Sequence, residues 1–195
     1  PCDSPMAHTM KMIRKYYPQF AQYRIAVISP CYSKRREFDA IGLGDYNVTL
    51  KSIEEYCEDK NISIASFPER DFDGGVAERA VLFSTPGGLM RTAEREVPGI
   101  SVKTKRIEGQ PAVYSYLAHL DNAIQRKDAP VYELIDCLNC ELGCNAGPGT
   151  RNHDKHPDRL EGFVERRKVQ AVERYRNKTV MKSPKSGARK LAKEV

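Results

Sequence analysis

Three cysteines within eight residues limit the folds that are open to this chain. They are Cys137, Cys140 and Cys144, in the pattern C-x-x-C-x-x-x-C, and a glycine-containing stretch, 145–149, follows them directly. Cysteines this close together make a poor disulfide framework, whereas their thiolates can reach one metal centre. The glycines let the backbone approach a bulky inorganic cluster closely. The segment therefore predicts a metal-binding loop.

Three interpretations of this loop remain open from its residues alone: an iron–sulfur cluster, a zinc site, or unligated cysteines in a tight turn. The order of the cysteines differs from the C-x-x-x-C-x-x-C of radical-SAM enzymes and from the C-x-x-C-x-x-C of ferredoxins. Zinc prefers a compact set of four ligands, and the best-placed fourth ligand lies far upstream in the sequence. Soft thiolates at this spacing therefore favour an iron–sulfur cluster.

Two further cysteines lie at the ends of predicted elements. Cys31 follows a short apolar stretch at 24–29, which predicts a buried strand, and precedes three basic residues at 34–36. Such a positive field favours a thiolate and holds an anionic ligand, although a buried cysteine beside a basic turn has the same pattern. Cys2 precedes a predicted helix at 3–17, whose N-terminal N–H groups would stabilise its thiolate.

The hydrophobic pattern predicts strands and helices in alternation. Strands are expected at 24–29, 100–107 and 131–137, helices at 3–17, 49–59, 89–95, 112–127 and 160–178, and short apolar runs at 62–67 and 80–84. This alternation predicts an α/β fold with a mainly parallel sheet flanked by helices and a basic helical C-terminal segment. Because sites gather at the C-terminal ends of parallel strands, Cys31 and the three-cysteine loop are expected on one edge of one sheet.

Two of the predicted helices carry specific burial expectations. In helix 49–59, Leu50, Ile53 and Cys57 fall on one face, so Cys57 is expected among apolar core neighbours. Helix 160–178 is expected to turn five side chains inward: Leu160, Phe163, Val164, Val172 and Tyr175.

The net charge of the 195 residues is +6, and it is concentrated at the C-terminal end. Residues 151–195 contain 14 Lys and Arg against 6 Asp and Glu. No aromatic interleaving accompanies these charges, so we expect a solvated basic tail or linker at 179–195 rather than a nucleic-acid partner. No apolar run reaches the length of a membrane span, and no secretion signal is visible, which together with the cysteine usage predicts a reducing, cytoplasmic compartment.

Three cysteine segments, taken together, resemble a known family. PCDSP at 1–5, PCYSKRRE at 30–37 and CLNCELGCNAGPGT at 137–150 are similar to the three signature loops of the [FeFe]-hydrogenase large subunit, in the same order. The intervening FSTPGGLM at 83–90 resembles a glycine turn of that family. The resemblance implies the C-terminal, cluster-binding half of the family's catalytic domain, at 1–178. Its first loop, P-C-x-S-P, is closest to the sensory-type branch.

The resemblance also implies a cofactor and its ligands. A [4Fe–4S] cluster would be held by Cys2, Cys31, Cys140 and Cys144, the last of which bridges to a diiron unit with CO, cyanide and a dithiolate. Lys34 matches the lysine that hydrogen-bonds a cyanide ligand, a role that suits a compact ammonium donor. Glu37 matches an acidic residue of the proton path, although its basic neighbours equally suit a structural ion pair. Cys137 has no counterpart and is expected near the cluster without binding iron.

The implied activity is reversible oxidation of H2, and two departures from the family's catalytic branch imply a slow or H2-sensing protein. Pro1 stands where a cysteine relays protons, and Ser29 and Leu138 stand where methionines flank the diiron unit. A chain that opens on Pro1 is expected to be an excised or processed piece. The implied partners are the upstream half of the same domain and either a ferredoxin-type electron carrier or a downstream signalling domain. The alternatives are a [4Fe–4S]-only protein for electron transfer or cluster assembly, and a zinc-stabilised interaction domain.

Overall fold

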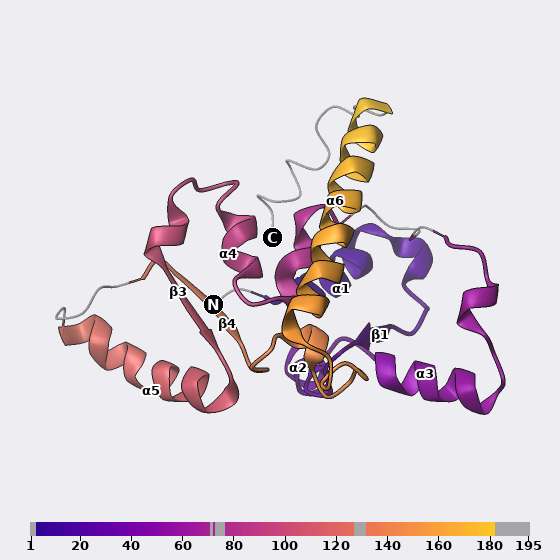
Figure 1. The fold of residues 1–195 in the computed structure, drawn as a ribbon, viewed down its shortest axis with the longest axis horizontal. Coiled ribbons are helices and arrows are strands. Elements are labelled where there is room, and N and C mark those ends of the chain that lie inside the picture. Colours follow the sequence, from indigo (N-terminus) through magenta and orange to yellow (C-terminus); the bar gives the residue numbers. More distant parts are fainter. Residues whose placement is uncertain (1–2, 71, 73–76, 127–131, 182–195) are drawn as a thin grey trace.

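The computed structural model describes residues 3–70, 72, 77–126 and 132–181, with the arrangement shown in Figure 1. In chain order the elements are α1 (Pro5–Tyr16), η1 (Pro18–Phe20), β1 (Ala26–Ser29), α2 (Lys34–Ile41), β2 (Tyr46–Thr49), α3 (Leu50–Asp59), η2 (Ile64–Ser66), η3 (Arg79–Ser84), α4 (Gly88–Ala93), η4 (Ile100–Lys103), β3 (Thr104–Glu108), α5 (Gln110–Arg126), β4 (Leu134–Leu138), η5 (Cys144–Ala146) and α6 (Pro157–Met181), where η denotes a 3-10 helix. The expected α/β class is confirmed, because the strands pair in parallel and helices connect them.

The strands form two βαβ units rather than one sheet. β1 pairs with β2 in parallel, from Ala26 opposite Tyr46 to Ser29 opposite Thr49, and α2 makes the crossover. β3 pairs with β4 in the same way through α5. A helical crossover is the usual way to join parallel neighbours. The expectation of one continuous sheet is therefore wrong for the described residues, which contain two two-stranded sheets.

The chain between the two sheets explains why they do not join. The apolar runs at 62–67 and 80–84 contain the short 3-10 helices η2 and η3. Leu82 of η3 is only 1% exposed, and η3 packs against α4 and α6. A 3-10 helix has no extended edge to offer to a strand ladder. The segment therefore contributes to the core without bridging β2 and β3.

One helix and one strand, α2 and β2, were not predicted from the sequence. The basic stretch that begins at Lys34 is the first turn of α2, which buries Phe38 to 2% exposure. Gly42 ends this helix at φ 66°, in the left-handed region that glycine adopts without a steric penalty. The eight residues of α2 are mostly charged, and only Phe38 among them is buried. They therefore show no repeat of apolar residues at helical spacing that would predict a helix.

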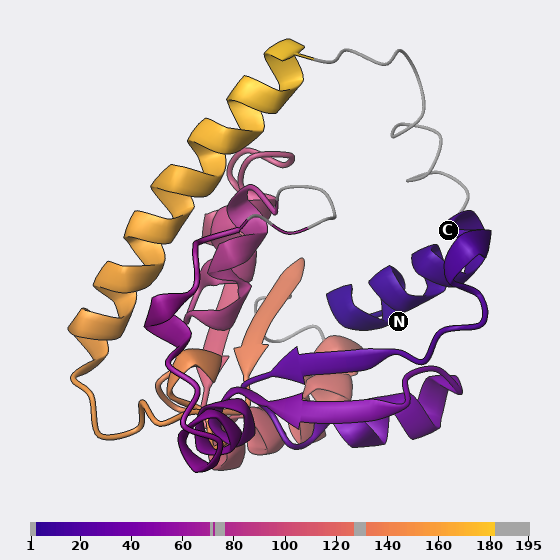
Figure 2. The same cartoon turned by 90° about the vertical axis from the view of Figure 1, so that its right-hand side faces the viewer.

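Helix α6 lies along one flank of the molecule and contacts it mainly through η3 and η5 (Figures 1 and 2). Of its expected inward residues, Leu160 is buried, whereas Phe163 and Tyr175 are 50% and 39% exposed. The expectation fails for these two because only a narrow stripe of α6 has neighbours to pack against. The guanidinium group of Arg166 lies 4.7 Å from the centre of the Phe163 ring and covers it instead.

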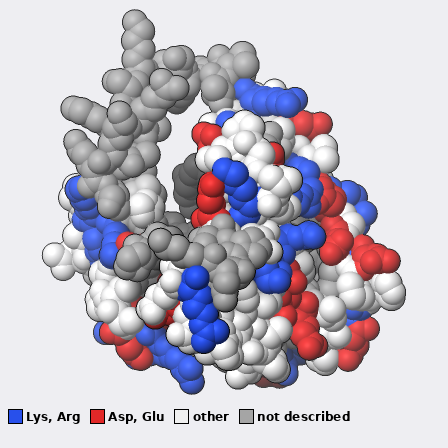
Figure 3. All heavy atoms as spheres, turned by 90° about the vertical axis from the view of Figure 1, so that its left-hand side faces the viewer, with Lys and Arg blue, Asp and Glu red and all other residues white. Residues whose placement is uncertain are grey.

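The surface charges of the described residues are mixed. On the face shown in Figure 3, Lys and Arg side chains are interspersed with Asp and Glu. Within α6, Glu165 pairs with Lys168 at 3.2 Å and with Arg91 of α4. The basic helix is thus partly neutralised by its own acidic residues. None of the described helices is long and apolar enough to cross a membrane.

A buried carboxylate joins the second βαβ unit to the glycine turn. Asp136 of β4 is 2% exposed, and its Oδ2 accepts a hydrogen bond from the Met90 backbone N–H at 2.8 Å. Met90 lies in the first turn of α4, where N–H groups have no partner within the helix. The N-cap residue Gly87 has no side chain to cap this turn. Asp136 therefore caps α4 from another element, and its charge also suits the helix N-terminus.

We expect Asp136→Ala to lower the free energy of unfolding by about 2 kcal/mol, because the Met90 N–H then loses its partner in a buried place. Asp136→Asn keeps an acceptor oxygen and is expected to cost about half as much. Urea denaturation followed by circular dichroism measures both values. Equal losses for the two variants would contradict a capping role.

Candidate functional site

Three cysteines from the two βαβ units line one cavity of about 300 Å³. Cys31 follows β1, whereas Cys140 and Cys144 follow β4. The sequence analysis placed these cysteines on one edge of a single sheet, but two sheets deliver them to a common pocket. Cys2, the fourth expected ligand, and Pro1 lie outside the described residues. The cavity thus unites every expected ligand that the structure describes.

The Cys31 loop is held by hydrogen bonds to both strands of its unit. The Cys31 N–H donates to Oγ of Ser29, which is 7% exposed, at 3.2 Å. The Asn47 amide of β2 donates to the carbonyl oxygens of Cys31 and Tyr32, each at 3.0 Å. This role of Asn47 was not predicted from the sequence, because its strand was not predicted. These bonds fix the backbone from which the Cys31 thiol projects.

The glycines after Cys144 allow the two cysteine loops to meet. The Gly149 N–H donates to the Pro30 carbonyl at 3.1 Å, next to Cys31. A Cβ on Gly149 would lie 2.7 Å from that carbonyl, and a Cβ on Gly147 would lie 3.5 Å from the Cys140 sulfur. Contacts below 3.0 Å to backbone atoms leave no room for a side chain. The glycine stretch therefore allows the loop after Cys144 to pack closely against the Cys31 loop.

The environment of the thiols favours their neutral form in the absence of a metal. Burial raises the pKa of the Cys140 thiol, and the nearby Cys31 raises it further. The pKa of the Cys144 thiol is also raised by burial first and then by Cys140 and Cys31, whereas Lys34 opposes this shift. Like charges that share a small site disfavour ionisation of each group. Metal binding at this cavity would therefore release protons.

Lys34 and Glu37 are joined to each other and to the first loop. The Lys34 ammonium lies 2.7 Å from Oε2 of Glu37, one turn along α2. The Ser4 hydroxyl donates to Glu37 Oε1, and Ser4 also caps α1 by accepting from Ala7 N–H at 3.2 Å. Glu37 therefore ties α2 to the start of α1. Ser4 belongs to the segment 1–5, so this tie joins the described part of that segment to the helix that follows Cys31.

Neither of the two remaining described cysteines lines this cavity. Cys57 of α3 is half-buried, and α3 has no fully buried residue, so the expectation of an apolar core position for Cys57 is wrong. The reason is that α3 lies at the surface, where Leu50 is 42% exposed. Cys137 is exposed, on the opposite face of β4 from the buried Asp136. The pKa of its thiol is raised by partial burial and by Asp136.

The donor set of the cavity fits an iron–sulfur cluster. Among the described residues, no three His, Cys, Asp or Glu side chains are grouped as a site for a single ion. A cubane instead takes one thiolate at each of its four irons, so its ligands need not converge on a single ion, and it needs backbone that can approach its sulfides closely. Cys31, Cys140 and Cys144, with the glycine stretch beside them, meet these requirements. The residues present therefore fit such a cluster, with one ligand still to be supplied.

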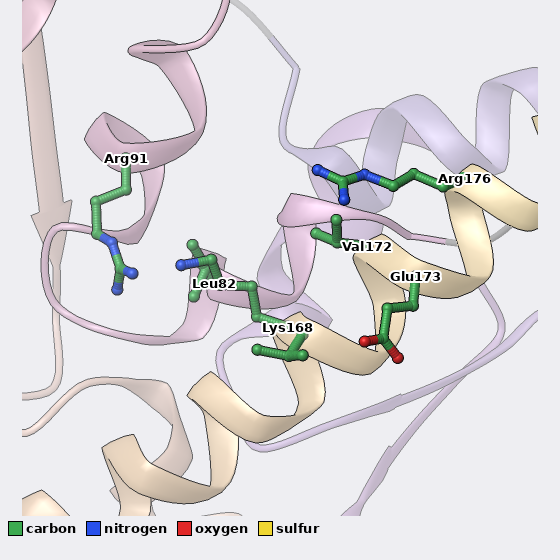
Figure 4. Close-up of a pocket in the computed structure, with 7 residues that line it drawn as sticks. Leu82, Arg91, Lys168, Val172, Glu173 and Arg176 are labelled. Carbon is green, nitrogen blue, oxygen red and sulfur yellow. The ribbon is translucent and has the colours of Figure 1, made fainter.

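A second cavity, of about 380 Å³, lies between η3, α4 and α6 (Figure 4). Arg91 of α4 and Lys168 of α6 line it together with the buried Leu82. Both cations are paired with Glu165, and this pairing raises the pKa of Arg91. We interpret this cluster as a tie between α4 and α6.

Comparison with known proteins agrees with the fold and identifies a family. The family described as "Iron only hydrogenase large subunit, C-terminal domain" matches residues 1–148. A solved [FeFe]-hydrogenase, from work on oxygen inactivation of its H cluster 2Fe subcluster, has a TM-score of 0.57 at 20% identity over 84% of this chain. The HydA(deltaEFG) structure, from work on stepwise H-cluster assembly, has a TM-score of 0.56 at 19% identity over 84% of this chain. No curated protein sequence matches.

The fold and its cysteine loops thus define an α/β domain of the hydrogenase class. The chain belongs to the iron-only hydrogenase family, as a C-terminal domain of the large subunit, because the family match covers most of its length. It spans 58% of the length of each of the two solved hydrogenase chains.

Proposed function

We propose that this chain is the cluster-binding half of an [FeFe]-hydrogenase-type oxidoreductase, whose reaction converts H2 reversibly into two protons and two electrons. The observation that carries the proposal is the meeting of Cys31, Cys140 and Cys144 in one cavity. Membership of the family supports it. Because the chain spans 58% of the solved hydrogenases, the activity is proposed for the whole protein.

In this proposal Cys2 would join the three described cysteines as the fourth ligand of a [4Fe–4S] cluster, and Cys144 would be the ligand that the cluster shares with the diiron unit. Bound there, the cofactor would supply H2 cleavage and electron transfer. The Lys34 ammonium would donate to a cyanide ligand, a role that suits a compact cationic donor placed three residues after Cys31. Glu37 would orient Lys34 through their 2.7 Å ion pair and accept protons on the proton path.

The proposed protein is slow or H2-sensing rather than a fast catalyst. Pro1 has no ionisable side chain where the catalytic branch has its relay cysteine. Ser29 and Leu138 stand at the two positions where that branch has methionines. The Ser29 hydroxyl accepts a hydrogen bond from the Cys31 N–H, and Leu138 is the last residue of β4. The proton route and the surroundings of the diiron unit would therefore both differ from those of the catalytic branch.

The proposed partners are the upstream half of the same domain and, beyond it, a ferredoxin-type carrier or a downstream signalling domain. Exposed aromatic side chains support an interface with the upstream half: Phe20 and Tyr23, after α1, are 48% and 67% exposed. Their rings contact each other at 6.1 Å, and such patches mark interaction sites. We propose domain limits of 1–178, with 179–195 as a basic linker.

Metal analysis and infrared spectroscopy of the full-length, maturated protein test the proposal. We expect iron with acid-labile sulfide, and bands of metal-bound CO and cyanide. Iron and sulfide without those bands would indicate the [4Fe–4S]-only alternative for electron transfer or assembly. Zinc in place of iron would indicate an interaction domain and would exclude a hydrogenase.

The rate of H2 uptake tests the sensory part of the proposal. A positioned proton donor typically contributes about 10²–10⁴-fold, so we expect the protein to be roughly tens of times or more slower than the catalytic branch. Pro1→Cys in the maturated full-length protein should raise the rate, whereas Pro1→Ser, which lacks an acidic thiol, should not. Wild-type turnover that already equals the catalytic branch would show another proton route.

A further inference from the structure

Helix α3 is joined at two points to the segment that leaves the cysteine loop. Near its N-terminus, the Lys51 N–H donates to the Gly149 carbonyl at 2.9 Å. Along its length, the Arg151 guanidinium lies against three carboxylates of α3: Glu54, Glu55 and Glu58. The sequence analysis assigned no role to this arginine or to these acidic residues.

The Arg151 contacts form a network rather than a single surface pair. Its two terminal nitrogens each donate to one oxygen of Glu58, the longer bond being 2.8 Å. Its Nε lies 3.7 Å from Glu54. This arrangement raises the pKa of Arg151 and lowers that of the Glu58 carboxyl. Isolated exposed pairs contribute little to stability, but a bidentate Arg–carboxylate bond within a network is the exception.

Arg151 is rigidly coupled to the cysteine loop through its neighbour. Thr150 is 3% exposed, and its hydroxyl donates to the Gly147 carbonyl at 2.8 Å. The same oxygen accepts from the Asn152 N–H at 3.2 Å, and the Asn152 amide donates to the Asn145 carbonyl at 3.1 Å. The residues on both sides of Arg151, Thr150 and Asn152, are thus hydrogen-bonded to the turn that begins at Cys144. A shift of Arg151 moves this turn.

Helix α3 is coupled to the Cys31 loop as well. It begins at Leu50, directly after β2, and β2 carries the Asn47 amide that binds the Cys31 carbonyl. The Gly149 N–H completes the connection by donating to Pro30. One helix therefore holds both loops whose cysteines share the cavity.

We propose that Arg151 is a positioning residue for the cysteine cavity: by binding the acidic face of α3, it keeps Cys140 and Cys144 opposite Cys31. This inference rests on the proposed function, since a cluster is the group that the three thiols would hold. It assigns to Arg151 no contact with the cluster itself.

Release of iron to a chelator from the reconstituted full-length protein tests the proposal. We expect Arg151→Ala to release iron about tenfold faster, the scale on which residues around metal ligands act. Arg151→Lys should be intermediate, because an ammonium cannot form the two-pronged bond. Glu58→Gln added to Arg151→Ala should have no further effect, since the pair acts together. Lys103→Ala, which breaks an exposed 2.7 Å pair with Glu133, is the matched control and should leave release unchanged.

Ionic strength and hydrogen exchange separate positioning from general damage. Molar salt should accelerate iron release from the wild type but not from Arg151→Ala, because an exposed network is screened. In the metal-free full-length protein, the amides of Gly149 and Lys51 should exchange faster in Arg151→Ala.

The outcomes distinguish this inference from the proposed function. Iron retention that is equal in the wild type and in Arg151→Ala would overturn the inference and leave the cluster assignment intact. A wild-type protein that takes up no cluster would overturn the proposed function. In that case hydrogen exchange of the metal-free protein still tests the positioning role of Arg151. Unchanged exchange of the Gly149 amide in Arg151→Ala contradicts this role, and faster exchange supports it.

Discussion

Replacing Cys144 by Ser is expected to abolish iron–sulfur binding by the full-length protein. Loss of a group that merely supports a metal ligand costs about 10–100-fold in affinity, and loss of a soft thiolate ligand should exceed that. Cys144 lines the cavity together with Cys31 and Cys140, and neither Cys57 nor Cys137 lines it, so no other described cysteine is placed to replace Cys144. Iron and acid-labile sulfide per chain, measured after reconstitution, give the result.

Cys57→Ser and Cys137→Ser are the matched controls, because each removes a thiol that does not line the cavity. Both should retain iron at nearly the wild-type level. A Cys137→Ser variant that lost its cluster, beside a Cys144→Ser variant that kept it, would show that the ligand set is displaced by one cysteine within the loop.

Gly149→Ala is expected to lower the free energy of unfolding by about 3 kcal/mol, at the upper end for overpacking. Its Cβ would lie 2.7 Å from the Pro30 carbonyl carbon and oxygen, which are backbone atoms that cannot rotate away. Forcing these loops apart should also reduce iron loading, since the same contact brings Cys31 to the other thiols. Chemical denaturation of the metal-free protein measures the stability loss.

Gly162→Ala is the control for this substitution. A Cβ at Gly162 meets nothing closer than the end of the Arg166 side chain, at 3.8 Å. Alanine in the interior of a helix is favoured over glycine by about 1 kcal/mol, so this variant should be as stable as the wild type or more stable. Similar losses for both variants would mean that the close approach at Pro30 is not what requires glycine at 149.

Most of the α-helices, though not α2, and the α/β class could be predicted because they depend on local patterns. Ser4, Pro5 and the apolar spacing after them mark the start of α1, and the structure begins that helix at Pro5. The alternation of elements likewise predicted parallel pairing, which the two βαβ units show. Such patterns arise within a few residues of one another, so a single sequence contains them.

The positions of Phe163 and Cys57 could not be predicted, because burial depends on the neighbours that an element meets. Phe163 has the helical spacing of a core residue, yet α6 passes the body of the protein on too narrow a stripe to cover it. Cys57 lies on the more apolar side of α3, but that side remains half-open. Periodicity gives the direction of a face and says nothing of whether another element reaches it.

By itself, the sequence determined the family, the α/β class and the cysteines available to a metal, because each is a matter of residue type, order and spacing. Only the tertiary structure decided that two separate sheets bring Cys31 together with Cys140 and Cys144. It also revealed the roles of Asn47 and Arg151, which act through contacts with residues distant in the chain. The physical reason is that a shared cavity is created by packing between loops, and packing depends on the whole set of neighbours.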